Sequence, residues 1–237
     1  MRFLFIHGSW HGAWVWRKVL PHIQLEGHEA IAIDLPGRGR APAAPALVGL
    51  GAMTQTILRA LPSTTKSTIV VHSRYGVAAS SASEQAPDRI ARVIYLASFM
   101  APNGKRVLDY ANDPDSLLTG NIDGSRLALW DWLRPEAYTE ALYADCPPDD
   151  IALARALLVR EPSRPALGRL RLSPHGYGRV PRAYIRLTQD RAVSLKLQDR
   201  LIGEAGADRI ESLATSHSPY FSQPEALGRT ILRLAGP

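Results

Sequence analysis

The sequence contains a single cysteine, Cys146, and no long hydrophobic run. One cysteine excludes a disulfide within the chain and is typical of a reducing compartment, so we expect a cytoplasmic protein. No run approaches the roughly 18 apolar residues that a membrane-spanning helix needs, so we expect no membrane partner. The apolar stretch at residues 3–6 leads directly into a glycine-containing turn, which predicts a first strand and not a signal peptide.

Acidic residues are outnumbered, because 22 Asp and Glu stand against 28 Lys and Arg and give a net charge of +6. A basic chain can attract nucleic acid. The arginines are densest between Arg155 and Arg182, where prolines and leucines separate them and no series of aromatic residues could stack on bases. We therefore expect a small-molecule substrate and no nucleic-acid partner.

Short apolar segments alternate with amphipathic segments at both ends of the 237-residue chain. This pattern is typical of α/β proteins and predicts a mostly parallel sheet of about six strands with helices on both faces. The predicted strands are residues 3–7, 30–35, 68–72, 92–97, 183–187 and 209–213. The predicted helices are residues 13–26, 47–61, a helix directly after residue 76, 195–205 and 224–234.

The alternation stops between residues 100 and 180, where turn signals dominate and one helix is predicted, at residues 149–159. Ligands of parallel sheets bind at the carboxyl ends of the strands. We interpret this segment as an inserted cap over that edge. The predicted organisation is a core of residues 1–99 and 181–237 with a cap of residues 100–180.

A β-branched strand stops at Ser73, and a helix of small residues follows at once. A strand that turns into a helix at one serine is typical of a nucleophile elbow. The usual signature is G-x-S-x-G, because glycine relieves crowding beside the serine. Here Val71 and Tyr75 occupy the two glycine positions. The place of Ser73 between a strand and a helix therefore fits an elbow, but the residues beside it depart from the elbow signature.

A serine nucleophile needs a basic histidine and an acid that orients it, and elbow enzymes carry them in the order serine, acid, histidine. Asp190 and His217 follow the last two predicted strands. Asp190 and Ser73 could instead each serve only as the N-cap of the helix that follows it. Because all three residues lie at the carboxyl ends of parallel strands, we favour a catalytic triad of Ser73, Asp190 and His217.

An attacked carbonyl also needs backbone N–H donors for its developing negative charge. These would come from Arg74, the residue after the nucleophile, and from Ser9 in the loop after the first strand, where Gly8 permits close approach. The competing reading of His7 and His11 as a metal pair is disfavoured, because no third ligand lies nearby and the two span a turn. We expect no metal and no cofactor.

Four aromatic residues are candidates for substrate binding: Trp10, Tyr75, Trp130 and Tyr138. Trp132 and Tyr143 extend the aromatic content of the cap, although aromatic residues at such spacings are also common in ordinary cores. Cys146 is a further candidate nucleophile, but it lacks an elbow context. We expect His72 to face away from Ser73 and to pack in the core.

Several motifs resemble one known family. Residues 7–14 read His-Gly-Ser-Trp-His-Gly-Ala-Trp, residues 34–39 read Asp-Leu-Pro-Gly-Arg-Gly, and the segments 188–192 and 216–224 surround Asp190 and His217. Together they resemble the α/β-hydrolase superfamily, and within it the small esterases of the plant methylesterase and hydroxynitrile-lyase group and their bacterial counterparts. The resemblance implies an α/β-hydrolase fold, the triad and oxyanion hole named above, and hydrolysis of small carboxylic esters without a cofactor.

The departures from that family leave alternatives open. Family members normally read Gly-His-Ser-x-Gly-Gly at the elbow, and here only Gly76 remains. The lyase branch carries a lysine where this chain has Ser218, so cyanohydrin cleavage is not expected. The first hypothesis is a serine hydrolase of a small, fairly apolar ester. The second is a non-hydrolytic cyclisation, elimination or rearrangement in which Arg74 and Tyr75 hold a substrate carboxylate or phenol, and the third is a ligand-binding protein.

Overall fold

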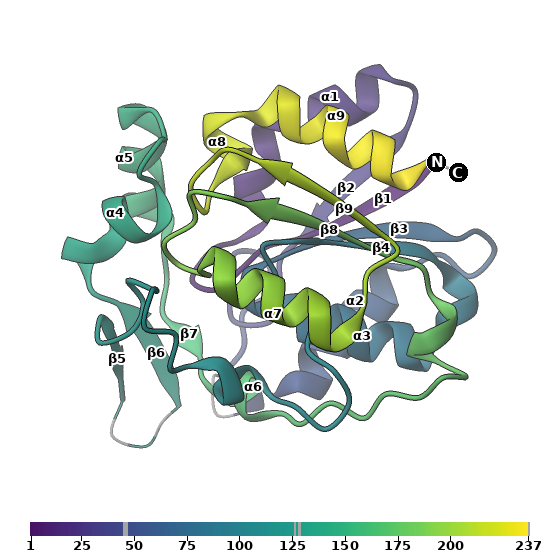
Figure 1. The fold of residues 1–237 in the computed structure, drawn as a ribbon, viewed down its shortest axis with the longest axis horizontal. Helices are drawn as coiled ribbons and strands as arrows, with labels where there is room; N and C mark the ends of the chain where they lie inside the picture. The colour runs from purple at the N-terminus through teal and green to yellow at the C-terminus, as the bar shows by residue number, and fades with distance from the viewer. Residues whose placement is uncertain (45–46, 126, 128, 237) are drawn as a thin grey trace.

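The computed structural model describes residues 1–44, 47–125, 127 and 129–236 of the chain. Within these residues one sheet has six strands in the order β2-β1-β3-β4-β8-β9, and each neighbouring pair runs parallel (Figure 1). The strands are β1 (Arg2–Ile6), β2 (Glu29–Ile33), β3 (Ser67–His72), β4 (Ile90–Leu96), β8 (Arg182–Leu187) and β9 (Arg209–Leu213). The predicted mostly parallel sheet of about six strands is confirmed.

Helices cover both faces of this sheet, α1 and α9 on one side and α2, α3 and α7 on the other (Figure 1). Strand β1 is therefore buried on both faces: Phe3 and Phe5 belong to one hydrophobic cluster, and Leu4 and Ile6 belong to another. Side chains alternate along a strand, so a strand covered on both faces is apolar throughout. The helices are α1 (Leu20–Leu25), α2 (Leu50–Ala60), α3 (Gly76–Gln85), α7 (Leu195–Ala205), α8 (Pro219–Ser222) and α9 (Pro224–Ala235).

The helix predicted at residues 13–26 is wrong as a single element. The structure has a 3₁₀ helix at Ala13–Lys18 and then α1, which begins at Leu20. Pro21 lies in the first turn of α1, and because proline has no N–H it cannot continue the hydrogen-bond ladder of a preceding helix. The helix predicted at residues 47–61 begins at Leu50, after the extended Gly49.

Much of the segment between β4 and β8, the predicted cap, lies over the edge of the sheet at which the strands end (Figure 1). Its three strands form a small antiparallel sheet in the order β5-β6-β7. Its last residues return to the core, where the backbone N–H groups of Ser173 and Tyr177 donate to Glu84 of α3. The elements are β5 (Ile122–Gly124), β6 (Trp130–Leu133), α4 (Tyr138–Leu142), α5 (Pro148–Leu157), β7 (Glu161–Pro162) and α6 (Arg164–Leu167).

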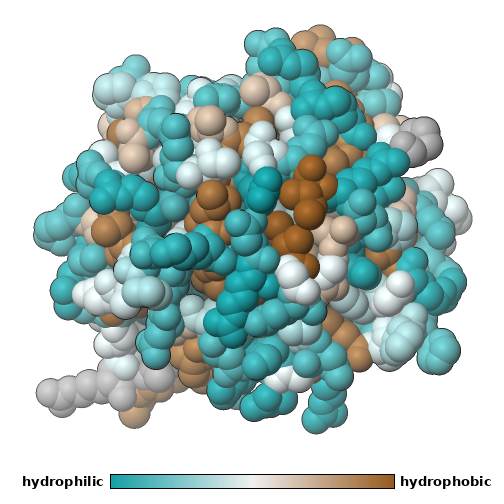
Figure 2. Space-filling view, viewed as in Figure 1, coloured by the Kyte–Doolittle hydropathy of each residue, from teal (hydrophilic) through white to brown (hydrophobic). Residues whose placement is uncertain are grey.

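The face of the molecule in Figure 2 is mostly hydrophilic, with hydrophobic side chains in small separate groups. Large apolar side chains that are exposed lie on different elements, Leu25 at the end of α1 and Ile210 on β9 among them. Among the helices of the described residues, none is both long and apolar enough to cross a membrane.

Candidate active site

Ser73 lies directly after β3, at the start of a 3₁₀ turn that leads into α3. Its φ is +57°, in the left-handed region that a side chain disfavours. Two hydrogen bonds to its carbonyl oxygen stabilise this conformation, one from the N–H of Phe99 at 3.0 Å and one from Ser98 Oγ at 2.7 Å. The chain therefore builds a strained strand-to-helix turn, as a nucleophile elbow requires, without the two usual glycines.

Three side chains converge at this turn from strands far apart in sequence. His217 Nδ1 lies 2.6 Å from Asp190 Oδ2, and His217 Nε2 lies 3.1 Å from Ser73 Oγ. All three residues are buried. A carboxylate accepts only, so Asp190 fixes the tautomer in which Nδ1 carries the proton and Nε2 accepts from the serine. In this state His217 can take the hydroxyl proton as Ser73 attacks a carbonyl.

Asp190 is itself held in place by the backbone that follows it. Its Oδ1 accepts from the N–H groups of Ala192 at 2.7 Å and Val193 at 2.9 Å. The loop after β8 thus orients the carboxylate so that Oδ2 alone faces His217. The imidazole of His217 is therefore held at Nδ1 by Asp190, and its Nε2 faces Ser73.

His72 packs in the core, but it also contacts the site. Its ring centroid lies 4.3 Å from that of His217, and its Nε2 donates to the His217 carbonyl oxygen at 3.0 Å. Burial, and then the neighbouring His217, hold the pKa of His72 well below its ordinary value. A neutral His72 therefore supports the backbone of His217, a role that sequence position alone does not indicate.

The loop after β1 lies against the elbow. A Cβ added to Gly8 would lie 2.8 Å from both His72 Nδ1 and Ser73 Cβ, so only glycine permits this approach. Ser9 and Arg74, the two expected oxyanion donors, both line the cavity in front of Ser73. The Ser9 hydroxyl is buried and has no hydrogen-bond partner in the described part of the chain.

His7 and His11 each bond to protein groups. His7 Nδ1 donates to the Gly8 carbonyl and His11 Nδ1 to the Ser9 carbonyl, while His11 Nε2 accepts from the Tyr143 hydroxyl. Burial is the main cause that lowers the pKa of His7 to about 4 and that of His11 to about 3. Both imidazoles are neutral near pH 7 and brace the loop after β1.

Two elbow residues, Arg74 and Tyr75, pair with acids of the cap. The Arg74 guanidinium contacts both oxygens of Asp131 on β6, at 2.8 and 3.3 Å. The Tyr75 hydroxyl donates to Glu161 on β7, and Arg38 pairs with the same carboxylate. Sequence analysis missed Asp131 and Glu161, because each belongs to a very short strand in the segment without clear alternation.

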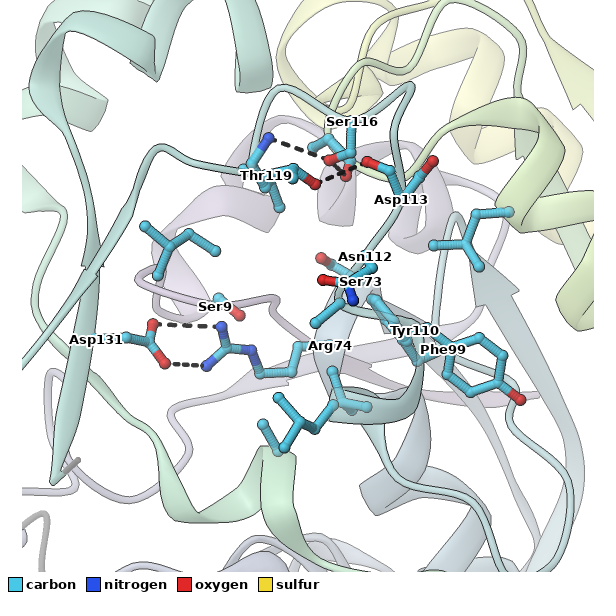
Figure 3. A pocket seen from close by; sticks show the side chains of 18 of the residues that line it. Ser9, Ser73, Arg74, Phe99, Tyr110, Asn112, Asp113, Ser116, Thr119 and Asp131 are labelled. Carbon is cyan, nitrogen blue, oxygen red and sulfur yellow. Dashed lines mark hydrogen bonds and ion pairs between the residues drawn. The ribbon is translucent and has the colours of Figure 1, made fainter.

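A cavity of about 360 Å³ opens in front of Ser73, between the core and the cap. One side carries the Arg74–Asp131 pair, and the opposite side carries small polar groups (Figure 3). Most of the wall is apolar, with Phe99, Val107, Leu108, Leu118, Ile122 and Leu197 contributing to it. The small polar groups are Asp113, Ser116 and Thr119, and Asn112 lies nearer Ser73 in the view of Figure 3. The space suits a small, largely apolar molecule.

Of the four aromatic candidates for substrate binding, Trp10 lies in the cavity wall and the other three do not. Tyr75 is fully buried and turns its hydroxyl toward Glu161. Trp130 packs under the Arg160 guanidinium, and Tyr138 packs against the hydrophobic cluster around α9. The sequence carries no signal for these directions, because they depend on how the cap folds.

Cys146 also lies outside the cavity wall. Its thiol approaches the Ser218 carbonyl, and burial, together with the neighbouring Asp145, raises the pKa of the thiol well above its ordinary value. A thiol that stays protonated near pH 7 is a poor nucleophile. Ser73 is therefore the better candidate.

Known proteins share this fold and are similar in sequence. A family model described as the alpha/beta hydrolase family matches residues 3–230. Putative methylesterase 11, chloroplastic, of Arabidopsis thaliana is 30% identical over 253 residues, which cover 98% of this chain and 63% of that protein. Methylesterase 1 of the same plant is 29% identical over 254 residues, which cover 98% of this chain and 95% of that protein.

A solved structure agrees with these matches. The crystal structure of the methylesterase MES16 from Arabidopsis is 26% identical and superposes with a TM-score of 0.83, covering 98% of each chain. The family model spans nearly all of the sequence and confirms the predicted fold, and the relatives named methylesterases confirm the resemblance to that group. The chain belongs to the alpha/beta hydrolase family of enzymes.

Proposed function

We propose that the protein hydrolyses a small, largely apolar carboxylic ester through an acyl-enzyme on Ser73. The observation that carries this proposal is the hydrogen-bonded series from Asp190 through His217 to Ser73, at 2.6 and 3.1 Å, which ends at the wall of a cavity of about 360 Å³. The methylesterase names of the relatives support an ester with a small alcohol group.

In the first half-reaction Ser73 Oγ attacks the ester carbonyl carbon while its proton passes to His217 Nε2. The carbonyl oxygen becomes an oxyanion that the N–H groups of Ser9 and Arg74 would bind. When the tetrahedral intermediate collapses, the bond to the alcohol oxygen breaks and that oxygen takes the proton from His217. A water molecule then repeats the sequence, releasing the acid and restoring Ser73.

The alternative of a non-hydrolytic reaction loses its main motivation. It required Arg74 and Tyr75 to hold a substrate carboxylate or phenol. Arg74 is engaged by Asp131, and Tyr75 is buried against Glu161. Asp131 offsets the charge of Arg74, and Tyr75 does not line the cavity, which together favour hydrolysis.

The test is hydrolysis of p-nitrophenyl acetate and of an aryl methyl ester by the wild type, by Ser73→Ala and by Ser81→Ala. Ser81 lies on the elbow helix α3, outside the cavity wall, and serves as the matched control. We expect Ser73→Ala to lose at least about 10³-fold in kcat, because the nucleophile is gone, and Ser81→Ala to keep wild-type turnover. Equal turnover by Ser73→Ala, or an inactive wild type, would overturn the proposal.

A further inference from the structure

One buried carboxylate of the cap contacts both segments that would form the oxyanion hole. Glu161 is fully buried and accepts the N–H of Trp10 at 2.6 Å, as well as the hydroxyl of Tyr75. Trp10 directly follows Ser9, and Tyr75 directly follows Arg74. The same carboxylate therefore holds the residue next to each of the two expected donors.

The carboxylate is charged in this position. Burial alone raises the pKa of Glu161, but the guanidinium groups of Arg38 and Arg74 outweigh it and hold the pKa below its ordinary value. Arg38 is buried beside it and pairs with it directly. A charged acceptor makes stronger hydrogen bonds than a neutral one, so Glu161 binds the Trp10 N–H and the Tyr75 hydroxyl more strongly than a neutral side chain would.

A second cap acid repeats this arrangement. Asp131 accepts the indole N–H of Trp10 at 3.0 Å and pairs with the Arg74 guanidinium at 2.8 Å. It too joins the loop after β1 to the elbow. Two carboxylates from neighbouring cap strands, β6 and β7, thus bridge the same two segments of the core.

Trp10 needs such support, because its φ is +61°. A residue with a bulky side chain keeps a left-handed backbone only where its surroundings hold it there, at a cost of about 1–3 kcal/mol. The contact with Glu161 takes up the Trp10 N–H, so the loop would offer the N–H of Ser9 to the substrate. If the two carboxylates were lost, Trp10 could relax, and Ser9 would turn with it.

We infer that Glu161 and Asp131 are positioning residues that hold the oxyanion donors Ser9 and Arg74 in catalytic geometry. The inference rests on the proposed ester hydrolysis. Tyr75 occupies a position that is usually glycine, and the cap acids act on the elbow through Tyr75 and the neighbouring Arg74. The cap thereby completes the catalytic site of the core as well as covering it.

The variants Glu161→Gln and Asp131→Asn test this inference, with Asp150→Asn as the matched control. Asp150 lies on cap helix α5, is buried, and pairs with Arg17 and Lys18 of the core. Like Asp131 and Glu161, Asp150 forms a buried ion pair between the cap and the core. It contacts neither of the two segments that carry the oxyanion donors Ser9 and Arg74. Active Ser73 is titrated with a fluorophosphonate, so that kcat refers to correctly folded sites.

We expect kcat to fall about 10–100-fold in Glu161→Gln with KM changed less than threefold, since removing one oxyanion donor outright costs about 10²–10³-fold. Affinity for an aryl trifluoromethyl ketone, which forms an oxyanion on the serine, should fall in parallel in both variants. Asp150→Asn should keep the wild-type kcat and ketone affinity. A purely structural role would lower the titrated fraction and leave these two quantities unchanged.

Glu161→Gln leaves Arg38 without its charge partner and can fail to fold, in which case Asp131→Asn decides alone through its ketone affinity. Wild-type kcat and ketone affinity in the folded variants would overturn the inference. So would an equal loss in Asp150→Asn. An inactive wild type, by contrast, would overturn the proposed hydrolysis itself.

Discussion

Asp190 has two oxygens with different tasks, and this division predicts the effect of replacing it. Oδ1 accepts from two backbone N–H groups, so an asparagine at this position keeps its carbonyl oxygen there. Its NH₂ group then points at His217 Nδ1, which must accept. The imidazole proton is forced onto Nε2, where it donates to Ser73 and cannot receive the serine proton.

We therefore expect kcat of Asp190→Asn to be about 10³–10⁴-fold below that of the wild type, with the fold retained. The measurement is ester hydrolysis together with near-UV circular dichroism. Asp199→Asn, which removes an exposed carboxylate that pairs with Arg186 on the surface, is the control and should keep full activity. A kcat of Asp190→Asn within tenfold of the wild type would contradict the assigned tautomer.

At the scale of elements, Gly76 is the one elbow glycine of the family pattern that this chain keeps, and the crowded space around it explains why. A Cβ at this position would lie 2.6 Å from Ser98 Oγ and 2.7 Å from the Phe99 carbonyl oxygen. Val71 and Tyr75 meet no such obstacle, because Val71 packs in a hydrophobic cluster and Tyr75 reaches across to Glu161. The crowding at this elbow is thus concentrated where α3 begins.

Gly76→Ala should lower the free energy of unfolding by about 1–3 kcal/mol, because the backbone of Phe99 cannot move aside cheaply. It should also reduce kcat, since Ser98 Oγ supports the Ser73 carbonyl. Gly203→Ala in α7 is the matched control, because a Cβ there meets nothing within 4 Å. That variant should be more stable by about 0.5–1 kcal/mol in urea denaturation. Equal stability of the two variants would refute this account of the elbow.

The elements of the core could be predicted from the sequence because their signals are local. Strands buried on both faces read as apolar runs, and Ser73 and Asp190 each follow such a strand, whereas His217 follows the edge strand β9, in which partly buried and exposed residues alternate. The cap lacks such signals. Strand β7 has two residues and β6 has four, too few for a clear period of two, so no sequence pattern pointed to the acids Asp131 and Glu161.

At the scale of the whole molecule, the cap is joined to the core by buried charges as well as by apolar contacts. Asp131, Asp150 and Glu161 are all buried and each pairs with a basic residue of the core. Two of the arginines that contribute to the basic excess, Arg38 and Arg74, lie inside the protein. Which charges are buried depends on the docking of the cap, and no local pattern encodes that.

Three histidines are buried as neutral groups, and this predicts how stability depends on pH. Burial is the main cause that lowers the pKa of His7 to about 4, of His11 to about 3 and of His72 well below its ordinary value. In the unfolded chain each titrates near 6.5. Between about pH 6.5 and 4 the unfolded state therefore binds more protons than the folded state, and stability falls as pH falls.

Each such histidine contributes up to about 1.4 kcal/mol per pH unit, so we expect the free energy of unfolding to fall by roughly 3–4 kcal/mol between pH 6 and pH 5. Urea denaturation at several pH values measures this slope. Glu161 acts in the same direction, because a carboxyl group with a lowered pKa in the folded state loses its stabilising effect as pH falls through that pKa. In His11→Asn, where the amide can still donate to the Ser9 carbonyl, the slope should drop by about a third because one of the three histidines is gone. A free energy of unfolding that stays constant from pH 7 to pH 5 would show that these imidazoles become protonated inside the folded protein.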